Sequence, residues 1–315
     1  MGGRVLEVPA DVRRKALVQG AEGARWLERL GASVEELERD WHIRVGSALQ
    51  GGSDAYVAEA TTSDGSKAVL KLALPGDGTA HQIETLLRAD GRGYVRLLRH
   101  DTSRQAMLQE RLGASLAELG VPVRRQIEII CGTLRRGWEV SPDPSFPSGA
   151  EKARALGTFI EATWSECDQP CRERVIERAL SFARTREAAF DPEHSVLVHG
   201  DAHAANTLVA LRSRGPSGRR FKFVDPDGLF AERACDLAVP MRGWSSELLA
   251  GDTVLLGRER CTYLSRLSGV DAQSIWEWGF VERVSTGLLA LRVGRESLGR
   301  EMLAVAESFS TAGRI

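Results

Sequence analysis

A segment in the middle of the chain, VLVHGDAHAANTLVA at residues 196–210, places polar side chains between two apolar runs. Asp201 directly follows a strand-like run, and Asn206 stands where the chain enters another strand. The alternation of His199, Asp201 and His203 is compatible with a metal site, a nucleophile site or a loop that handles phosphate. The choice among these depends on which other residues share the site.

A second carboxylate, Asp225, ends the apolar run of FKFVDPDG. A small set of oxygen ligands such as Asn206 and Asp225 suits magnesium, which keeps several waters and binds substrate phosphates. Asp201 would then stand near an acceptor hydroxyl. A zinc site normally has three or four protein ligands, and apart from His194 the remaining histidines fall in the first third of the sequence. No Ser or Cys occupies a strand-to-helix elbow, where a nucleophile is expected.

Two features of the N-terminal half point to a phosphate ligand. The turn in LQGGSDAYV exposes the amides of Gly51, Gly52 and Ser53, which a phosphate oxygen can approach closely, although most Gly-Gly turns are only hairpin connections. In AVLKLAL, Lys71 either lies on a solvated face or meets a carboxylate and a phosphate, because an unpaired buried ammonium is costly. Glu84, in the next helical segment, is the predicted partner. A strand lysine paired with a helix glutamate is typical of kinase-type sites.

The elements that position these residues fall into two groups. Residues 9–40 have helical apolar spacing, and the period then changes to that of strands around one helix at 78–89. The five predicted strands, forming a mainly antiparallel sheet, are 41–49, 55–62, 67–74, 94–101 and 104–112. Later segments are mostly helical, namely 121–137, 149–164, 170–190 and 271–293, the last capped by Asp271, with short strands at 206–210 and 221–225. We therefore predict an α+β fold with a helical extension (1–40), a small β-rich N-lobe (41–112) and a larger helical C-lobe (113–315).

The composition excludes several classes of partner. The chain has 42 basic and 43 acidic residues and a net charge of −1, so neither nucleic acid nor an anionic membrane surface is an expected ligand. No stretch approaches the roughly 20 apolar residues of a spanning helix. The N-terminus lacks the apolar core of a signal peptide, and five scattered cysteines indicate reduced thiols. We expect a monomeric, cytoplasmic protein.

The segments VLVHGDAHAANTLV and FVDPDG together resemble the paired signature of the aminoglycoside phosphotransferases, which have a two-lobed, protein-kinase-like fold. The closer resemblance is to the branch of streptomycin 6-phosphotransferases and hydroxyurea-resistance kinases. In that branch a WL..L helix, an AVLKL strand, LLRHD followed by MLQERL, and DPDG occur in the same order. The similarity runs over nearly the whole chain, from about Val8 onward.

The resemblance implies ATP and Mg²⁺ as cofactors and assigns roles to single residues. Asp201 is the implied catalytic base, and Asn206 and Asp225 are the implied magnesium ligands. His199 and the Asp236 of CDLA match positions that support the catalytic loop, and His203 matches a histidine that is frequent in the family, without an assigned role. The implied nucleotide contacts are Gly51, Gly52, Ser53, Lys71, Glu84 and the backbone from Glu110 to Leu112.

Two departures from protein kinases accompany the resemblance. Pro226 replaces the flexible residue of the protein-kinase metal loop, which suggests a fixed loop, and no activation segment is present. The predicted function is therefore ATP-dependent phosphorylation of a hydroxyl on a small molecule, foremost an aminoglycoside of the streptomycin type. The alternatives are hydroxyurea or another small metabolite as acceptor, a nucleotide-binding pseudokinase, and a zinc hydrolase.

The acceptor-binding residues are less clear from the sequence. Acidic and aromatic side chains in the C-terminal helices suit a cationic acceptor, but core tryptophans and solvated acids are the more common arrangement. Trp276 and Trp278 are two positions apart and cannot share one helical face. The other candidates are Trp244, Glu247, Asp252, Glu277 and Glu282.

Overall fold

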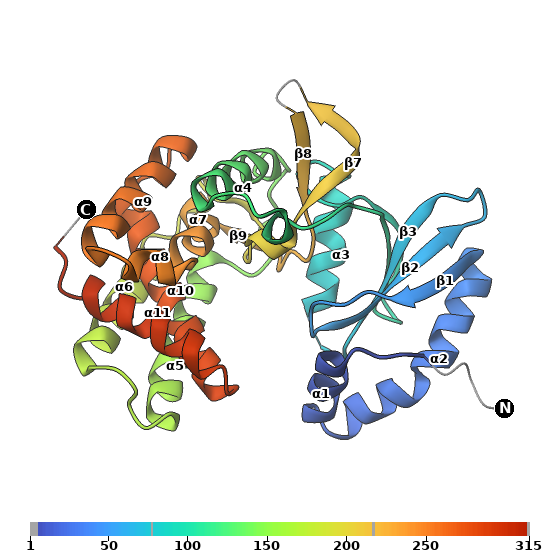
Figure 1. The fold of residues 1–315 in the computed structure, drawn as a ribbon, viewed down its shortest axis with the longest axis horizontal. Coiled ribbons are helices and arrows are strands. Elements are labelled where there is room, and N and C mark those ends of the chain that lie inside the picture. Colours follow the sequence, from blue (N-terminus) through green and yellow to red (C-terminus); the bar gives the residue numbers. More distant parts are fainter. Residues whose placement is uncertain (1–5, 77, 216–217, 314–315) are drawn as a thin grey trace. The chain divides into compact units, whose positions relative to one another are not determined.

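The computed structural model describes residues 6–76, 78–215 and 218–313. The backbone packs into two compact units (Figure 1). Unit 1 comprises Met1–Gly113 and Ala210–Arg220, and unit 2 comprises Ala114–Val209 and Phe221–Ile315. Residues 210–220, predicted for the helical lobe, therefore belong to unit 1, where Leu211 shares a shallow pocket with Asp64 and Arg111.

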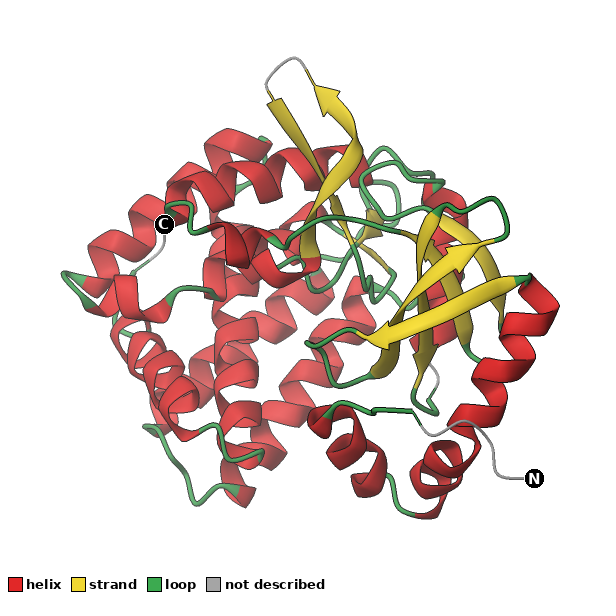
Figure 2. Cartoon of the chain, turned by 45° about the vertical axis from the view of Figure 1, so that its right-hand side comes forward, coloured by secondary structure: helices red, strands yellow, loops and turns green. Residues whose placement is uncertain are grey.

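Unit 1 is built on a five-stranded sheet in the order β1-β2-β3-β5-β4, with every neighbouring pair antiparallel (Figure 2). This confirms the predicted sheet. Lys71 lies in the central strand, opposite Val57 of β2 and Met107 of β5. The strands are β1 (Ile43–Ala48), β2 (Ala55–Thr62), β3 (Lys67–Ala73), β4 (Leu97–Asp101) and β5 (Ala106–Glu110), and helix α3 (Gly78–Ala89) connects β3 to β4.

The N-terminal segment of unit 1 is two helices, α1 (Ala10–Val18) and α2 (Ala21–Trp41), where the sequence predicted one helical stretch. The chain breaks at Gly20, whose φ of +68° is left-handed and favours glycine. The two helices then approach so closely that a Cβ on Gly23 would lie 1.8 Å from the carbonyl oxygen of Ala16. The first five residues of the predicted extension lie outside the described residues.

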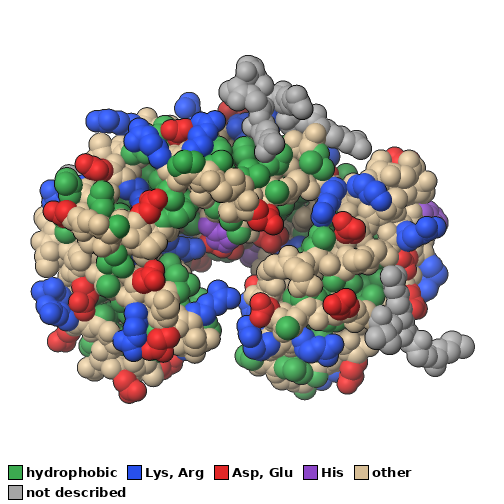
Figure 3. All heavy atoms as spheres, in the orientation of Figure 1, with side chains coloured by type: hydrophobic (Ala, Val, Ile, Leu, Met, Phe, Trp, Pro, Cys, Tyr) green, Lys and Arg blue, Asp and Glu red, His purple; other side chains and the backbone are tan. Residues whose placement is uncertain are grey.

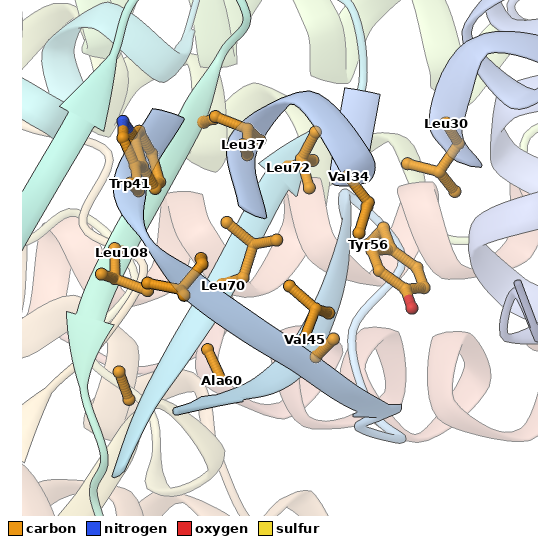
Figure 4. Close-up of a cluster of buried hydrophobic side chains, with 14 residues drawn as sticks. Leu30, Val34, Leu37, Trp41, Val45, Tyr56, Ala60, Leu70, Leu72 and Leu108 are labelled. Carbon is orange, nitrogen blue, oxygen red and sulfur yellow. The ribbon is translucent and has the colours of Figure 1, made fainter. Parts of the chain in front are cut away.

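Helix α2 covers one face of the sheet with an apolar stripe (Figure 4). Its buried residues recur every three or four positions, as expected for a helix with one face against a core. Side chains from β1, β2, β3 and β5 pack against this stripe. The shared cluster includes Leu30, Val34, Leu37, Trp41, Val45, Tyr56, Leu70, Leu72 and Leu108.

Unit 2 is mostly helical, and α10 (Ala272–Arg292) is its central element. Residues on all sides of α10 are buried, including both Trp276 and Trp278, so this helix has little solvated face. Its N-terminus is capped by Asp271, which accepts from Ser274 N–H at 2.8 Å. The other helices are α4 (Val123–Gly137), α5 (Gly149–Glu166), α6 (Glu173–Ala188), α7 (Arg233–Arg242), α8 (Ser245–Leu249), α9 (Thr253–Ser268) and α11 (Glu296–Phe309), with short 3-10 turns at Leu116–Leu119 and Ala204–Asn206.

Short strands carry the predicted motif residues of unit 2. Strand β6 (Val196–Val198) pairs antiparallel with β9 (Leu229–Ala231), and β7 (Thr207–Gly215) pairs with β8 (Gly218–Phe223). Asp201 follows β6, and Asp225 follows β8. The architecture is therefore the α+β arrangement predicted from the sequence, an antiparallel sheet in one unit and helices in the other.

The distribution of surface charge and the apolar content of the helices bear on whether the protein could bind nucleic acid or a membrane. On the face drawn in Figure 3, basic and acidic side chains are interspersed over both units, in keeping with the near-zero net charge. Among the helices that the structure describes, none has both the length and the apolar content needed to span a bilayer.

Candidate active site

The loop after β6 is held in place by a buried carboxylate. Asp236, in the first turn of α7, is fully buried, and its two oxygens accept from the amides of His199 at 3.1 Å and Gly200 at 2.9 Å. The indole N–H of Trp138, at the end of α4, donates to the same carboxylate at 2.8 Å. Asp236 thus fixes the backbone immediately before Asp201, the supporting role that the resemblance implied.

A second loop, Val224–Gly228, is hydrogen-bonded to the first. Val224 N donates to Asn206 O at 3.0 Å, and Asp227 N donates to His199 O at 2.8 Å. The His199 ring completes the connection, because its Nε2 lies 2.9 Å from Val224 O while its Nδ1 accepts from Asp201 N at 3.1 Å. This pattern places the proton of His199 on Nε2. The structure therefore brings the segments of Asp201, Asn206 and Asp225 together within unit 2.

The Asp201 carboxylate has a partner on each oxygen. Arg242, the last residue of α7, donates to Oδ1 at 2.6 Å, and Nε2 of His203 lies 3.2 Å from Oδ2. Because Nδ1 of His203 accepts from Asn206 N, its Nε2 carries the proton that faces Asp201. Burial alone would raise the pKa of Asp201, but the bond from His203 and the charge of Arg242 outweigh it and hold that pKa well below its usual range. Asp201 is therefore a carboxylate at neutral pH.

The oxygens of Asn206 and Asp225 fit a hard divalent cation. The Asn206 amide donates through Nδ2 to Asp201 O at 3.1 Å, so its remaining polar atom is the oxygen Oδ1. Asp225 has a φ of +57°, which few non-glycine residues adopt and which often marks a functional position. An amide oxygen and a carboxylate are ligands that Mg²⁺ accepts together with water and phosphate oxygens.

The same contacts argue against a zinc site. Both ring nitrogens of His199 are used by the backbone, and Nδ1 of His203 is used by Asn206 N. Over the ranges that the structure describes, no three His, Cys, Asp or Glu side chains are grouped to hold a metal ion. A closed or catalytic zinc site needs at least three such ligands.

In unit 1, Lys71 has a different partner from the one predicted. Its side chain is only 6% exposed, and Nζ lies 2.9 Å from Oε1 of Gln82 in α3. Glu84 instead forms an ion pair with Arg88 one turn later, at 2.7 Å, and lies partly exposed. The predicted Lys71–Glu84 pair was wrong because residues 82 and 84, two positions apart, lie on different faces of α3. The buried interpretation of Lys71 was right, and its contact on α3 is neutral.

The remaining unit 1 candidates occupy a turn and the end of a strand. Gly51 and Gly52 have φ values of +99° and +86°, which favour glycine, and a Cβ on either would meet open space. The Ser53 hydroxyl donates to Asp54 at 2.9 Å. Glu110 ends β5, where its carboxylate accepts from Arg96 N at 2.8 Å, and Leu112 is buried.

Sequence reasoning missed the connections among three charged residues of unit 2. Arg242 bridges Asp201 and Glu282, and Lys152 of α5 forms an ion pair with Glu282 at 2.8 Å. The sequence suggested Glu282 only as an acceptor contact or a solvated helix residue. A signal was present, since Glu282 directly follows the apolar run of residues 278–281 in a helix, and a charge that is buried there needs a partner.

The other C-terminal candidates have structural roles. Trp276 and Trp278 are 2% and 1% exposed, and Trp278 donates to Glu232 at 2.8 Å, so both are core residues. Glu277 forms a buried ion pair with Arg186 at 2.8 Å, Glu247 lies 3.3 Å from Arg260, and Asp252 caps α9. Trp244 remains a half-buried residue with a φ of +50° directly after α7.

Gly200 should tolerate no side chain. Its φ is +88°, and a Cβ would lie 2.6 Å from Oδ2 of Asp227. Gly200→Ala is expected to destabilise the protein by about 1–3 kcal/mol and to slow phosphoryl transfer by about 10²-fold, because the next residue is Asp201. Urea unfolding and steady-state kinetics measure the two effects. Gly132→Ala, in α4 with no atom near the added Cβ, is the control and should change neither by much. Wild-type stability and rate in Gly200→Ala would contradict the tight packing.

Comparison with known proteins gives the family. The profile described as "Aminoglycoside/hydroxyurea antibiotic resistance kinase" matches residues 40–294. The streptomycin 6-kinase of Streptomyces glaucescens is 27% identical over 309 residues, 97% of each chain. The hydroxyurea phosphotransferase of Kitasatospora aureofaciens is 30% identical over 288 residues, covering 87% of this chain and 81% of that protein.

Solved structures show the same fold at low sequence identity. The choline kinase LicA from Streptococcus pneumoniae aligns with a TM-score of 0.58 at 14% identity, covering 89% of this chain and 98% of that one. A thermostable mutant of an aminoglycoside phosphotransferase, in ternary complex with AMP-PNP and hygromycin B, aligns with a TM-score of 0.59 at 14% identity and the same coverage. The architecture is thus kinase-like. With a family profile spanning most of its length, the chain belongs to the aminoglycoside/hydroxyurea antibiotic resistance kinases.

Proposed function

We propose that this protein transfers the γ-phosphoryl group of ATP to a hydroxyl of a small molecule, foremost an aminoglycoside of the streptomycin type. The observation that carries the proposal is the Asp201 carboxylate, ionised and fixed on both oxygens, in a loop bonded to the segments of Asn206 and Asp225. The similarity to streptomycin 6-kinases over nearly the full length supports the acceptor class.

Asp201 acts on the acceptor in this proposal. Phosphoryl transfer passes through a loose transition state, so most of the acceleration comes from positioning and charge neutralisation. The carboxylate accepts a hydrogen bond from the acceptor hydroxyl, orients its oxygen toward phosphorus, and takes the proton late in the reaction. Its low pKa keeps it in the accepting form throughout the neutral range.

Asn206 and Asp225 hold Mg²⁺ in this proposal. Bound there, the ion would neutralise charge on the nucleotide phosphates. Asn206 also acts within the chain, because its Nδ2 donates to the backbone carbonyl of Asp201 and fixes it in place. A change of Asn206 is therefore expected to affect both metal affinity and the position of the base.

Unit 1 binds the nucleotide in this proposal. Lys71 contacts phosphate oxygens, with Gln82 holding its ammonium in place, and the amides of Gly51, Gly52 and Ser53 approach the phosphates. The backbone from Glu110 to Leu112 meets adenine. Glu84, paired with Arg88, is the predicted nucleotide residue with the weakest structural support.

The test is a transfer assay with ATP, Mg²⁺ and a panel of acceptors. Streptomycin, other aminoglycosides and hydroxyurea are each incubated with wild-type protein and with Asp201→Asn, and scored by mass for one added phosphoryl group. We expect streptomycin to be modified by the wild type only. Hydroxyurea is the second candidate, because the hydroxyurea phosphotransferase is also similar over most of its length. If streptomycin is unchanged while another member gains phosphate, the acceptor class is wrong and the kinase assignment stands.

A further inference from the structure

Unit 2 buries a chain of alternating charges that ends on Asp201. The Arg242 guanidinium donates through one nitrogen to Asp201 Oδ1 at 2.6 Å and through the other to Glu282 Oε2 at 2.5 Å. The second oxygen of Glu282 lies 2.8 Å from Nζ of Lys152. We call Asp201, Arg242, Glu282 and Lys152 the Arg242 network.

The far end of the Arg242 network, Lys152, also contacts the loop that carries Asp201. Lys152 Nζ donates to the carbonyl oxygen of Gly200 at 3.2 Å, and Gly200 directly precedes Asp201. The loop is thereby held at two adjacent points, the Gly200 carbonyl and the Asp201 carboxylate, by residues from α5, α7 and α10. These helices also contact one another, so the anchors belong to one packed body.

Stability alone is a weak reason for this arrangement. Burying ion pairs is costly, and replacing them with well-packed apolar side chains is often neutral or stabilising. Glu282 is buried, and Lys152 and Arg242 are largely so. Burial opposes the charged form of each, yet Glu282 raises the pKa of both Lys152 and Arg242, so the network stays ionised.

The geometry suits orientation of a carboxylate. A guanidinium is planar, and with one nitrogen fixed by Glu282 the other can approach Asp201 from a single direction. A lysine at position 242 would present one rotatable ammonium and could not hold both carboxylates in fixed directions. The Asp201 plane is set by Arg242 on one oxygen and His203 on the other.

We propose that Arg242, held by Glu282 and Lys152, is a positioning residue that directs the Asp201 carboxylate toward the acceptor hydroxyl during phosphoryl transfer. The proposal rests on the proposed role of Asp201 as the base. Arg242 would then affect the rate of transfer although it is neither a nucleotide-binding residue nor a metal ligand, because it acts only through Asp201.

The experiment compares Arg242→Met and Arg242→Lys with Arg186→Met. Arg186 is a matched control, a buried arginine of unit 2 that pairs with Glu277 on the same helix α10 but does not touch Asp201. We expect Arg242→Met to reduce kcat by about 10²-fold and to leave KM for ATP within about threefold. Arg242→Lys should regain part of the rate. Arg186→Met should lower stability and leave kcat nearly unchanged. If Arg242→Met does not fold, Glu282→Gln supplies the same test.

A double-mutant cycle separates action through Asp201 from a general loss of structure. In the Asp201→Asn background, Arg242→Met should have little further effect on transfer, since the group through which it acts is gone. Multiplicative effects of the two changes would overturn the proposal. So would a kcat that falls no further in Arg242→Met than in Arg186→Met.

An NMR measurement without any acceptor tests the role of Arg242 separately from the proposed kinase activity. In protein labelled with ¹³C at the Asp carboxyl carbons, the Asp201 resonance is identified by its loss in Asp201→Asn. We expect its chemical shift at neutral pH to change in Arg242→Met, which removes the bond to Oδ1, and to stay unchanged in Arg186→Met. If the wild type phosphorylates no acceptor, the proposed function fails, and this chemical shift still decides whether Arg242 holds the Asp201 carboxylate.

Discussion

Asp201→Asn is expected to reduce phosphoryl transfer by about 10²–10⁴-fold while leaving ATP affinity nearly unchanged. The amide cannot accept the proton of the acceptor hydroxyl, and it presents an N–H₂ group toward either Arg242 or His203, both of which are donors. The residues proposed to bind the nucleotide are untouched. Steady-state kinetics with the acceptor found in the panel and calorimetric titration with the non-hydrolysable analogue AMP-PNP measure the two quantities.

The matched control for this change is Asp191→Asn. Asp191 lies in the turn before β6, is exposed, and accepts from His194 and Glu193 within that turn. It should lose no activity. Transfer at the wild-type rate in Asp201→Asn would remove Asp201 as the base. Loss of AMP-PNP binding together with transfer would show that Asp201 serves the nucleotide instead.

Asp236→Ala is expected to destabilise unit 2 by about 3–5 kcal/mol and to lower transfer sharply. The change leaves three buried N–H donors without their acceptor: the amides of His199 and Gly200 and the indole of Trp138. The two amides fix the backbone before Asp201, so the base loses its position as well. Urea unfolding followed by tryptophan fluorescence measures the stability, and kcat measures the positioning.

Trp138→Phe separates the two effects of Asp236. It removes the indole donor while the carboxylate keeps its bonds to His199 and Gly200. We expect a stability loss of about 1–2 kcal/mol and a nearly normal kcat. A kcat that falls as far in Trp138→Phe as in Asp236→Ala would mean that the bonds to the two amides are not what positions Asp201.

Local pattern was enough to predict much of this protein. The period-two pattern of the strand segments between residues 43 and 110, with the turn residues between them, predicts the antiparallel sheet. The Asp271 cap and the apolar run behind it predict α10. The motif order also predicted Asp201 and Asp225, which follow apolar runs, and Asn206, which directly precedes one.

Contacts between distant segments decided the rest. Which residue of α3 meets Lys71 depends on how the helix is rotated about its own axis. In the structure that rotation places Gln82 against Lys71, while Glu84, two positions later, pairs with Arg88. Arg242 bonds to Asp201 across 41 positions of sequence and to Glu282 across 40, separations that no local period predicts. A charged residue in a buried segment can be predicted from sequence to need a partner of opposite charge. Which partner lies within reach is determined only by the packing of helices α5, α7 and α10.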